Sequence, residues 1–156
     1  MQKKLQKLGL NPDNSIVIGS GILQALNIRK SNDIDLVVSS KDYTRLKKTG
    51  KILKTDNIEI ATIWQVSGKK YYFKNLAENS TVINNVRYIT LDFLYKTKKS
   101  WITNGTARPK DLKDIKLIEK YFATKTFAFR KQQRGFNHKP EDYIWMDFAK
   151  WFKQKK

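Results

Sequence analysis

The chain has 156 residues, which is the length of one domain with at most a small appendage. Hydrophobic residues make up 40% and aromatic residues 12%, and this composition excludes a disordered chain. The absence of cysteine excludes a disulfide scaffold, a thiolate metal site and a cysteine nucleophile. No run approaches the roughly 20 apolar residues of a membrane span, and the N-terminus does not resemble a secretory signal. We therefore expect a cytoplasmic protein that does not enter a membrane.

The charge is strongly positive. Lysine and arginine number 32 against 14 acidic residues, so the net charge is +18. Such an excess repels itself in the folded state, and a polyanion would relieve that repulsion. Nucleic acid is the first candidate partner and an anionic membrane surface the second, although a lysine-rich proteome gives the same charge without any partner. Contacts with nucleic acid are predicted at Lys47, Lys48, Arg130, Lys131 and Arg134, which a solvated surface would also explain.

The first half of the chain alternates between helix and strand patterns. Its expected elements are a basic helix at residues 1–10, a turn at 11–14, a strand at 15–18, a helix from Ile22 onward, a strand at 32–38, a helix at 43–48 and a strand at 57–64. Residues 71–77 are ambiguous.

The second half begins with a hairpin around Asn84-Asn85, because asparagine tolerates the left-handed conformation that such a turn requires. Thr90 is the expected N-cap of a helix over residues 91–99. Another helix follows Arg108, with Leu112, Ile115, Ile118 and Phe122 on one side, and the tail is expected to be helical from Glu141. Strands followed by helices predict an α/β or α+β fold with a mixed sheet.

A glycine-containing turn follows the first strand. The apolar run ends in Gly19-Ser20-Gly21, and a helix begins directly after it. Backbone N–H groups at such a turn can approach a phosphate, the helix dipole favours its negative charge, and the Ser20 hydroxyl adds a donor. Alone, the motif is more often an ordinary turn.

Two acidic residues follow about a dozen positions later. Asp33 and Asp35 point to one side of the expected strand because residues i and i+2 share a face, while Ile34 and Leu36 point to the core. Two carboxylates so close repel each other, which indicates a cation between them, and Mg²⁺ with nucleotide phosphates is the natural occupant. Two such ions would hold the attacking and the leaving oxygen of an in-line displacement.

In this order and spacing, Ile18-Gly19-Ser20 and Asp33-Ile34-Asp35 resemble the signature of the nucleotidyltransferase superfamily. That superfamily includes DNA polymerase beta, CCA-adding enzymes, aminoglycoside nucleotidyltransferases and the minimal bacterial nucleotidyltransferases. The resemblance implies a mixed sheet with helices mainly on one side. It also implies transfer of a nucleoside monophosphate from an NTP, with release of pyrophosphate, through Mg²⁺ or Mn²⁺ held by the acid pair and a third acid. Glu59 is our choice for that third acid, with Asp56 and Asp92 as alternatives, and Glu59 is otherwise an exposed strand residue.

A second resemblance lies downstream. Lys98 on one helix, followed by Arg108-Pro109-Lys110-Asp111 and Asp114, is similar to the C-terminal signature of bacterial nucleotidyltransferase-like toxins of toxin–antitoxin pairs. We assign Lys98, Arg108 and Lys110 to triphosphate or pyrophosphate oxygens, and the resemblance implies an antitoxin as a possible protein partner. Asp111 and Asp114, three residues apart, share one helix face and are expected to orient those cations or Lys98. The alternative is a purely structural role, in which Asp111 complements the helix dipole and Asp114 pairs with Arg108.

The two resemblances cover about residues 15–122, so we expect a nucleotidyltransferase core at 1–122 and a basic, aromatic, helical tail at 123–156 packed on it. One departure is Gly21, where many relatives carry an ordinary helix residue, and glycine costs a helix up to about 1 kcal/mol.

Other residues are assigned mainly to structure. His138 is expected in a loop, and core packing is favoured for the last-helix tryptophans. Tyr71-Tyr72-Phe73 beside lysines is a better candidate for base stacking, with strand core favoured. The expected function is NMP transfer to RNA, most specifically tRNA. The alternatives are transfer to a protein or small molecule, and a non-catalytic nucleic-acid-binding module.

Overall fold

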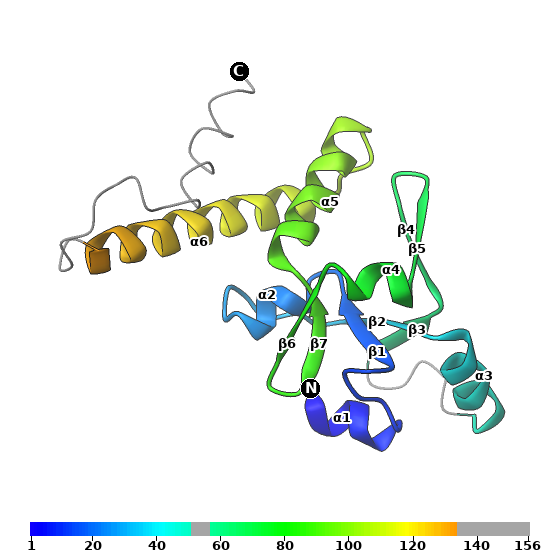
Figure 1. The fold of residues 1–156 in the computed structure, drawn as a ribbon. Helices are drawn as coiled ribbons and strands as arrows, with labels where there is room; N and C mark the ends of the chain where they lie inside the picture. Colours follow the sequence, from blue (N-terminus) through cyan, green and yellow to red (C-terminus); the bar gives the residue numbers. More distant parts are fainter. Residues whose placement is uncertain (51–56, 134–156) are drawn as a thin grey trace. The chain divides into compact units, whose positions relative to one another are not determined.

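The computed structural model describes residues 1–50 and 57–133, with side chains as far as residue 125 (Figure 1). The chain divides into two compact units, Met1–Glu119 and Lys120–Lys156. Both sheets and the candidate site lie in the first unit. The helix expected from Glu141 lies outside the described residues.

A five-stranded sheet forms the centre of the first unit (Figure 1). Its strands, in spatial order, are β3 (Ile58–Ala61), β2 (Ile34–Val38), β1 (Ser15–Ile18), β7 (Val86–Ile89) and β6 (Ser80–Ile83). The pairs β1–β2 and β6–β7 are antiparallel, whereas β2–β3 and β1–β7 are parallel. The expected mixed sheet and mixed α/β class are therefore confirmed.

A separate two-stranded sheet consists of β4 (Ile63–Val66) and β5 (Lys69–Tyr72). The single strand expected at residues 57–64 is wrong, because the chain bends at Thr62 and leaves the central sheet. Alternating side chains continue through the bend, so periodicity alone cannot separate two consecutive strands. The ambiguous residues 71–77 are the end of β5 followed by the short helix α4 (Phe73–Ala77).

The remaining helices are α1 (Gln2–Lys7), α2 (Gly21–Ala25), α3 (Ser40–Lys48), α5 (Leu91–Thr103) and α6 (Pro109–Gln133). The Thr90 cap is confirmed, since its hydroxyl accepts from the Phe93 N–H at 3.2 Å, although α5 continues one turn beyond the expected end. None of the described helices has both the length and the apolar character that crossing a membrane requires.

Helix α6 buries a face that carries charge. Pro109 stands at the first helical position, and the Asp111 side chain accepts from the Arg108 N–H at 3.0 Å, which caps the helix. The buried positions in its first turns are Asp111, Asp114, Ile115 and Ile118, at spacings of three and four. Leu112 was expected on the same side as Ile115 and Ile118, but it is 46% exposed, because Asp111 and Asp114 share the buried face with those two isoleucines.

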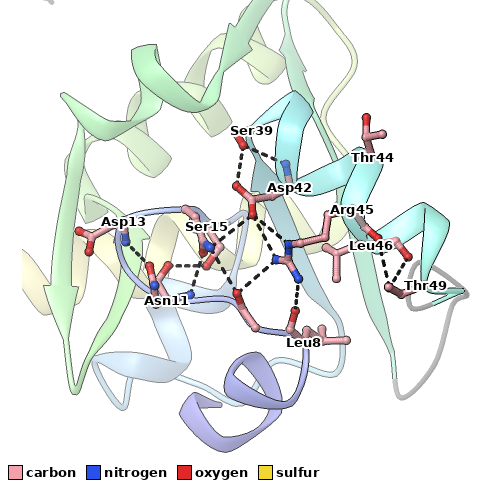
Figure 2. Close-up of polar contacts among 12 residues, drawn as sticks. Leu8, Asn11, Asp13, Ser15, Ser39, Asp42, Thr44, Arg45, Leu46 and Thr49 are labelled. Carbon is pink, nitrogen blue, oxygen red and sulfur yellow. Dashed lines mark hydrogen bonds and ion pairs between the residues drawn. The ribbon is translucent and has the colours of Figure 1, made fainter.

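Hydrogen bonds from Arg45 hold the turn after α1 against α3 (Figure 2). Arg45 donates to the carbonyl oxygens of Leu8 and Gly9 at 3.3 and 3.2 Å, and it pairs with Asp42 at 3.1 Å. Asn84 and Asn85 both have positive φ, of 48° and 58°, and form the expected turn between β6 and β7. The core of the first unit is built from fully buried aliphatic side chains, including Ile16, Val17, Leu36, Val37, Ile89 and Leu94.

Candidate active site

The glycine turn at the end of β1 lies against an acidic side chain. Gly19 has φ +60°, and a Cβ placed there would lie 3.2 Å from Oδ2 of Asp35. The Ser20 hydroxyl hydrogen-bonds the Ser31 hydroxyl at 2.8 Å, and Ser31 in turn donates to the Asp33 carbonyl at 2.9 Å. The turn and the loop that carries Asp33 are thereby tied together.

Gly21 is required by packing. A Cβ on Gly21 would come within 2.3 Å of Cγ1 of Val17, a stiff and fully buried side chain on β1. Gly21 therefore lets α2 approach the strand closely. Because α2 has only five residues, its dipole is weaker at the Gly19 turn than the sequence suggests.

Three acidic side chains line one cleft. Asp35 and Glu59 are direct partners across the parallel β2–β3 pair, so their side chains leave the sheet on the same face. Asp33 immediately precedes β2 and lines the same cleft. Burial raises the pKa of Asp35 above its ordinary value, and repulsion from Glu59 and Asp33 raises it further, against the opposing charges of Lys110 and Arg108.

The structure describes one of the two alternatives for the third acid. Asp92 lies in the first turn of α5, pairs with Lys96 at 2.7 Å and does not line the cleft. Asp56 lies outside the described residues. In the part of the chain that the structure describes, no three histidine or acidic side chains are gathered closely enough to hold a metal ion as they stand. The donor chemistry of Asp33, Asp35 and Glu59 nevertheless fits Mg²⁺, because their carboxylate oxygens are hard ligands. A bound cation would favour the ionised form of Asp35, whose pKa is raised by burial and by repulsion from the other two acids.

A buried lysine faces the acids' cleft from α5. Lys98 is 3% exposed, and its Nζ lies 2.6 Å from Oδ1 of Asp111 and 3.0 Å from Oδ2 of Asp114. Nε of Arg108 lies 3.0 Å from Oδ2 of Asp111. Burial opposes the charged form of Asp111, but hydrogen bonds from Arg108 and Lys98 outweigh it and hold its pKa well below the usual range. The pKa of Asp114 is also lowered: burial again opposes ionisation, but bonds from its cationic partners outweigh it.

Arg29 is a site residue that the sequence did not reveal. Its Nε donates to Oδ1 of Asp114 at 2.6 Å, and a second guanidinium nitrogen donates to Oδ2 at 2.9 Å. The alternative pairing of Asp114 with Arg108 is wrong, because Asp114 pairs with Arg29 and Lys98 instead. No local pattern could have paired Arg29 with a residue 85 positions away. We call the alternating set Arg29, Asp114, Lys98, Asp111 and Arg108 the ion-pair network.

The cleft has a volume of about 480 Å³ and three kinds of wall. The acids stand on one side, and the ion-pair network with Lys110 supplies cations. Trp64 and Trp101 supply aromatic surface, with ring centroids 6.5 Å apart in an edge-to-face arrangement. Gly19 and Ser20 also line it. Apart from the two alternatives for the third acid, the structure therefore brings together the residues that the sequence analysis assigned to catalysis, metal binding and nucleotide binding.

Of the predicted nucleic-acid contacts, Lys47 and Lys48 are not part of this cleft. Lys47 and Lys48 are exposed on α3, which follows the end of β2 opposite to Asp35. The side chains of Arg130, Lys131 and Arg134 lie outside the described residues, as does His138.

Comparisons with known proteins found no match: no protein-family model, no curated protein and no solved structure matches the chain.

Proposed function

We propose that this protein is a metal-dependent nucleotidyltransferase with a nucleotidyltransferase fold. It moves a nucleoside monophosphate from an NTP to an acceptor and releases pyrophosphate. The observation that carries the proposal is the side-by-side register of Asp35 and Glu59 next to the Gly19 turn, in a cleft whose other wall is cationic. Carboxylates that repel one another beside cations form a site for a metal–triphosphate complex.

The acidic wall holds the reacting centre. Asp33, Asp35 and Glu59 would hold the divalent cation, which supplies positive charge against the phosphate oxygens when it is bound. The Gly19 turn and the Ser20 hydroxyl donate hydrogen bonds to those oxygens. Glu59 accepts a hydrogen bond from the acceptor hydroxyl and orients it toward the α-phosphorus. The hydroxyl oxygen forms a bond to that phosphorus while the bond to the pyrophosphate oxygen breaks, and the hydroxyl proton passes to the Glu59 carboxylate.

The cationic wall stabilises the leaving group. Arg108 and Lys110 lie close enough to Asp35 to lower its pKa, so a triphosphate bound at the acids is within their field. The Lys98 ammonium is already shared by two buried carboxylates. We therefore assign Lys98 to holding Asp111, which in turn holds Arg108, rather than to direct neutralisation of pyrophosphate.

RNA is the proposed acceptor, with tRNA as the specific expectation. The net charge of +18 matches a polyanion, whereas a small neutral acceptor would not require it. A role as a toxin with an antitoxin partner rests on sequence resemblance alone.

The test is transfer of label from α-labelled NTPs in the presence of Mg²⁺ and total RNA, with each NTP tried separately. The proposal predicts labelled RNA with the wild-type protein and none with Asp33→Ala/Asp35→Ala. Label on protein would replace RNA by a protein acceptor. Absence of label, with RNA still retained on a filter, would overturn catalysis in favour of a binding module.

A further inference from the structure

The β4–β5 hairpin has two unlike faces. Its register pairs Trp64 with Tyr71 and Ile63 with Tyr72, and side chains alternate between the faces along each strand. Trp64 and Tyr71 therefore belong to one face, and Ile63 and Tyr72 belong to the other. The two adjacent tyrosines that the sequence could not separate thus have different surroundings.

The face of Trp64 and Tyr71 packs against α5. Their rings lie 6.1 and 5.4 Å from the ring of Phe93, both edge to face. The Ser67 and Ser100 hydroxyls are 2.8 Å apart and attach the hairpin's turn to the same helix. These contacts hold the face of Trp64 and Tyr71 against α5, whereas Tyr72 is the N-cap of α4 and its N–H donates to Oδ1 of Asn75 at 3.3 Å.

The opposite face carries three exposed side chains and, like the face of Trp64, reaches the cleft. Its members are Ile63, Gln65, Lys70 and Tyr72. Tyr72 is 49% exposed, and both Gln65 and Lys70 are exposed. Ile63 lines the cleft and is the direct cross-strand neighbour of Tyr72, so this face continues the cleft wall outward. We call Gln65, Lys70 and Tyr72 the hairpin platform.

We propose that the hairpin platform binds the unpaired end of the acceptor RNA beside the cleft. An exposed aromatic ring next to a cation and an amide is the combination that holds unstacked bases and their phosphates. Residues 63–72 contain no acidic side chain, so the charge of the platform is complementary to RNA. Tyr72 stacks on a base, Lys70 contacts a phosphate, and Gln65 bonds a base edge. This inference rests on the proposed function, because it names the surface that guides the acceptor to Glu59.

The test is the affinity of a fluorophore-labelled single-stranded RNA, measured by anisotropy with the full chain. Tyr72→Ala is expected to weaken binding about tenfold, while Tyr72→Phe keeps the ring and the affinity. Lys70→Gln is expected to weaken binding and to reduce the salt dependence by about one counterion. Val82→Ala is the matched control, because Val82 is 48% exposed on β6, at the far edge of the central sheet.

Unchanged RNA affinity in Tyr72→Ala would overturn the inference, and so would a wild-type protein that does not bind RNA. Calorimetry with Mg²⁺ and NTP separates this failure from failure of the proposed function. NTP binding that persists while Tyr72→Ala binds RNA normally leaves the transferase proposal standing without the platform. A wild-type protein that binds no NTP contradicts both.

Discussion

Replacing Lys98 by methionine tests how strongly the ion-pair network stabilises the fold. Methionine fills nearly the same volume, so the change removes the charge without opening a cavity. The Lys98 side chain is 4% exposed, and the carboxylates of Asp111 and Asp114 are 1% and 3% exposed. Removing one partner of a buried ion pair costs about 3–5 kcal/mol. Each aspartate keeps an arginine partner, so we expect the lower end, about 3 kcal/mol.

Urea unfolding measures this loss as a decrease in the free energy of unfolding, and the melting temperature should fall by roughly 6–12 °C. Lys96→Met is the matched control on the same helix. Lys96 pairs with Asp92 at 2.7 Å, but their side chains are 61% and 42% exposed, so its loss should cost less than about 0.5 kcal/mol. Equal losses in the two variants would refute the view that the buried network stabilises the site.

Three further predictions concern the same region. Gly21→Ala should destabilise the protein by about 1–2 kcal/mol although alanine favours helices, because the new Cβ meets Val17. In urea unfolding, the losses of Gly21→Ala and Val17→Ala should be less than additive in the double variant, and full additivity would contradict the contact. Asp35→Asn should raise the melting temperature of the metal-free protein at neutral pH while abolishing transfer. The reason is that the pKa of Asp35 is raised in the folded state, so its ionisation opposes folding as pH rises. A lower melting temperature in the variant would contradict this. The lowered pKa values of Asp111 and Asp114 give stability that is present above the ordinary value of 3.8 and lost as pH falls below it. The free energy of unfolding of Asp111→Asn/Asp114→Asn should therefore fall less than that of the wild type between about pH 5 and about pH 2. An identical pH dependence of unfolding in the two proteins would count against the ion pairs.

The sequence anticipated the acidic wall because strand periodicity places it. Asp35 lies in a strand with an apolar opposite face, and the alternation around Glu59 puts that side chain at its edge of the sheet. The glycine turn was visible for the same reason, since an apolar strand ends there. The packing role of Gly21 was not visible, because it depends on the Val17 side chain across the turn.

The cationic wall was anticipated only in part. Asp111 and Asp114 share a helix face in the sequence, but apolar periodicity assigned that face to Leu112 instead. Buried charge can occupy an inner face only when partners from distant segments meet it, and Arg29 is such a partner. Such long-range pairing has no local sequence signal, and neither does the bend at Thr62 that separates β3 from β4.

The most direct test of the transferase account follows both ends of the NTP. The protein is incubated with Mg²⁺, RNA and the same NTP, labelled at the α-phosphate in one reaction and at the γ-phosphate in the other, beside Glu59→Gln. The account predicts α-label in RNA, an equal amount of γ-label in pyrophosphate, and loss of both in the variant. Transfer of γ-label to RNA, or release of either label as free phosphate without labelled acceptor, would contradict it.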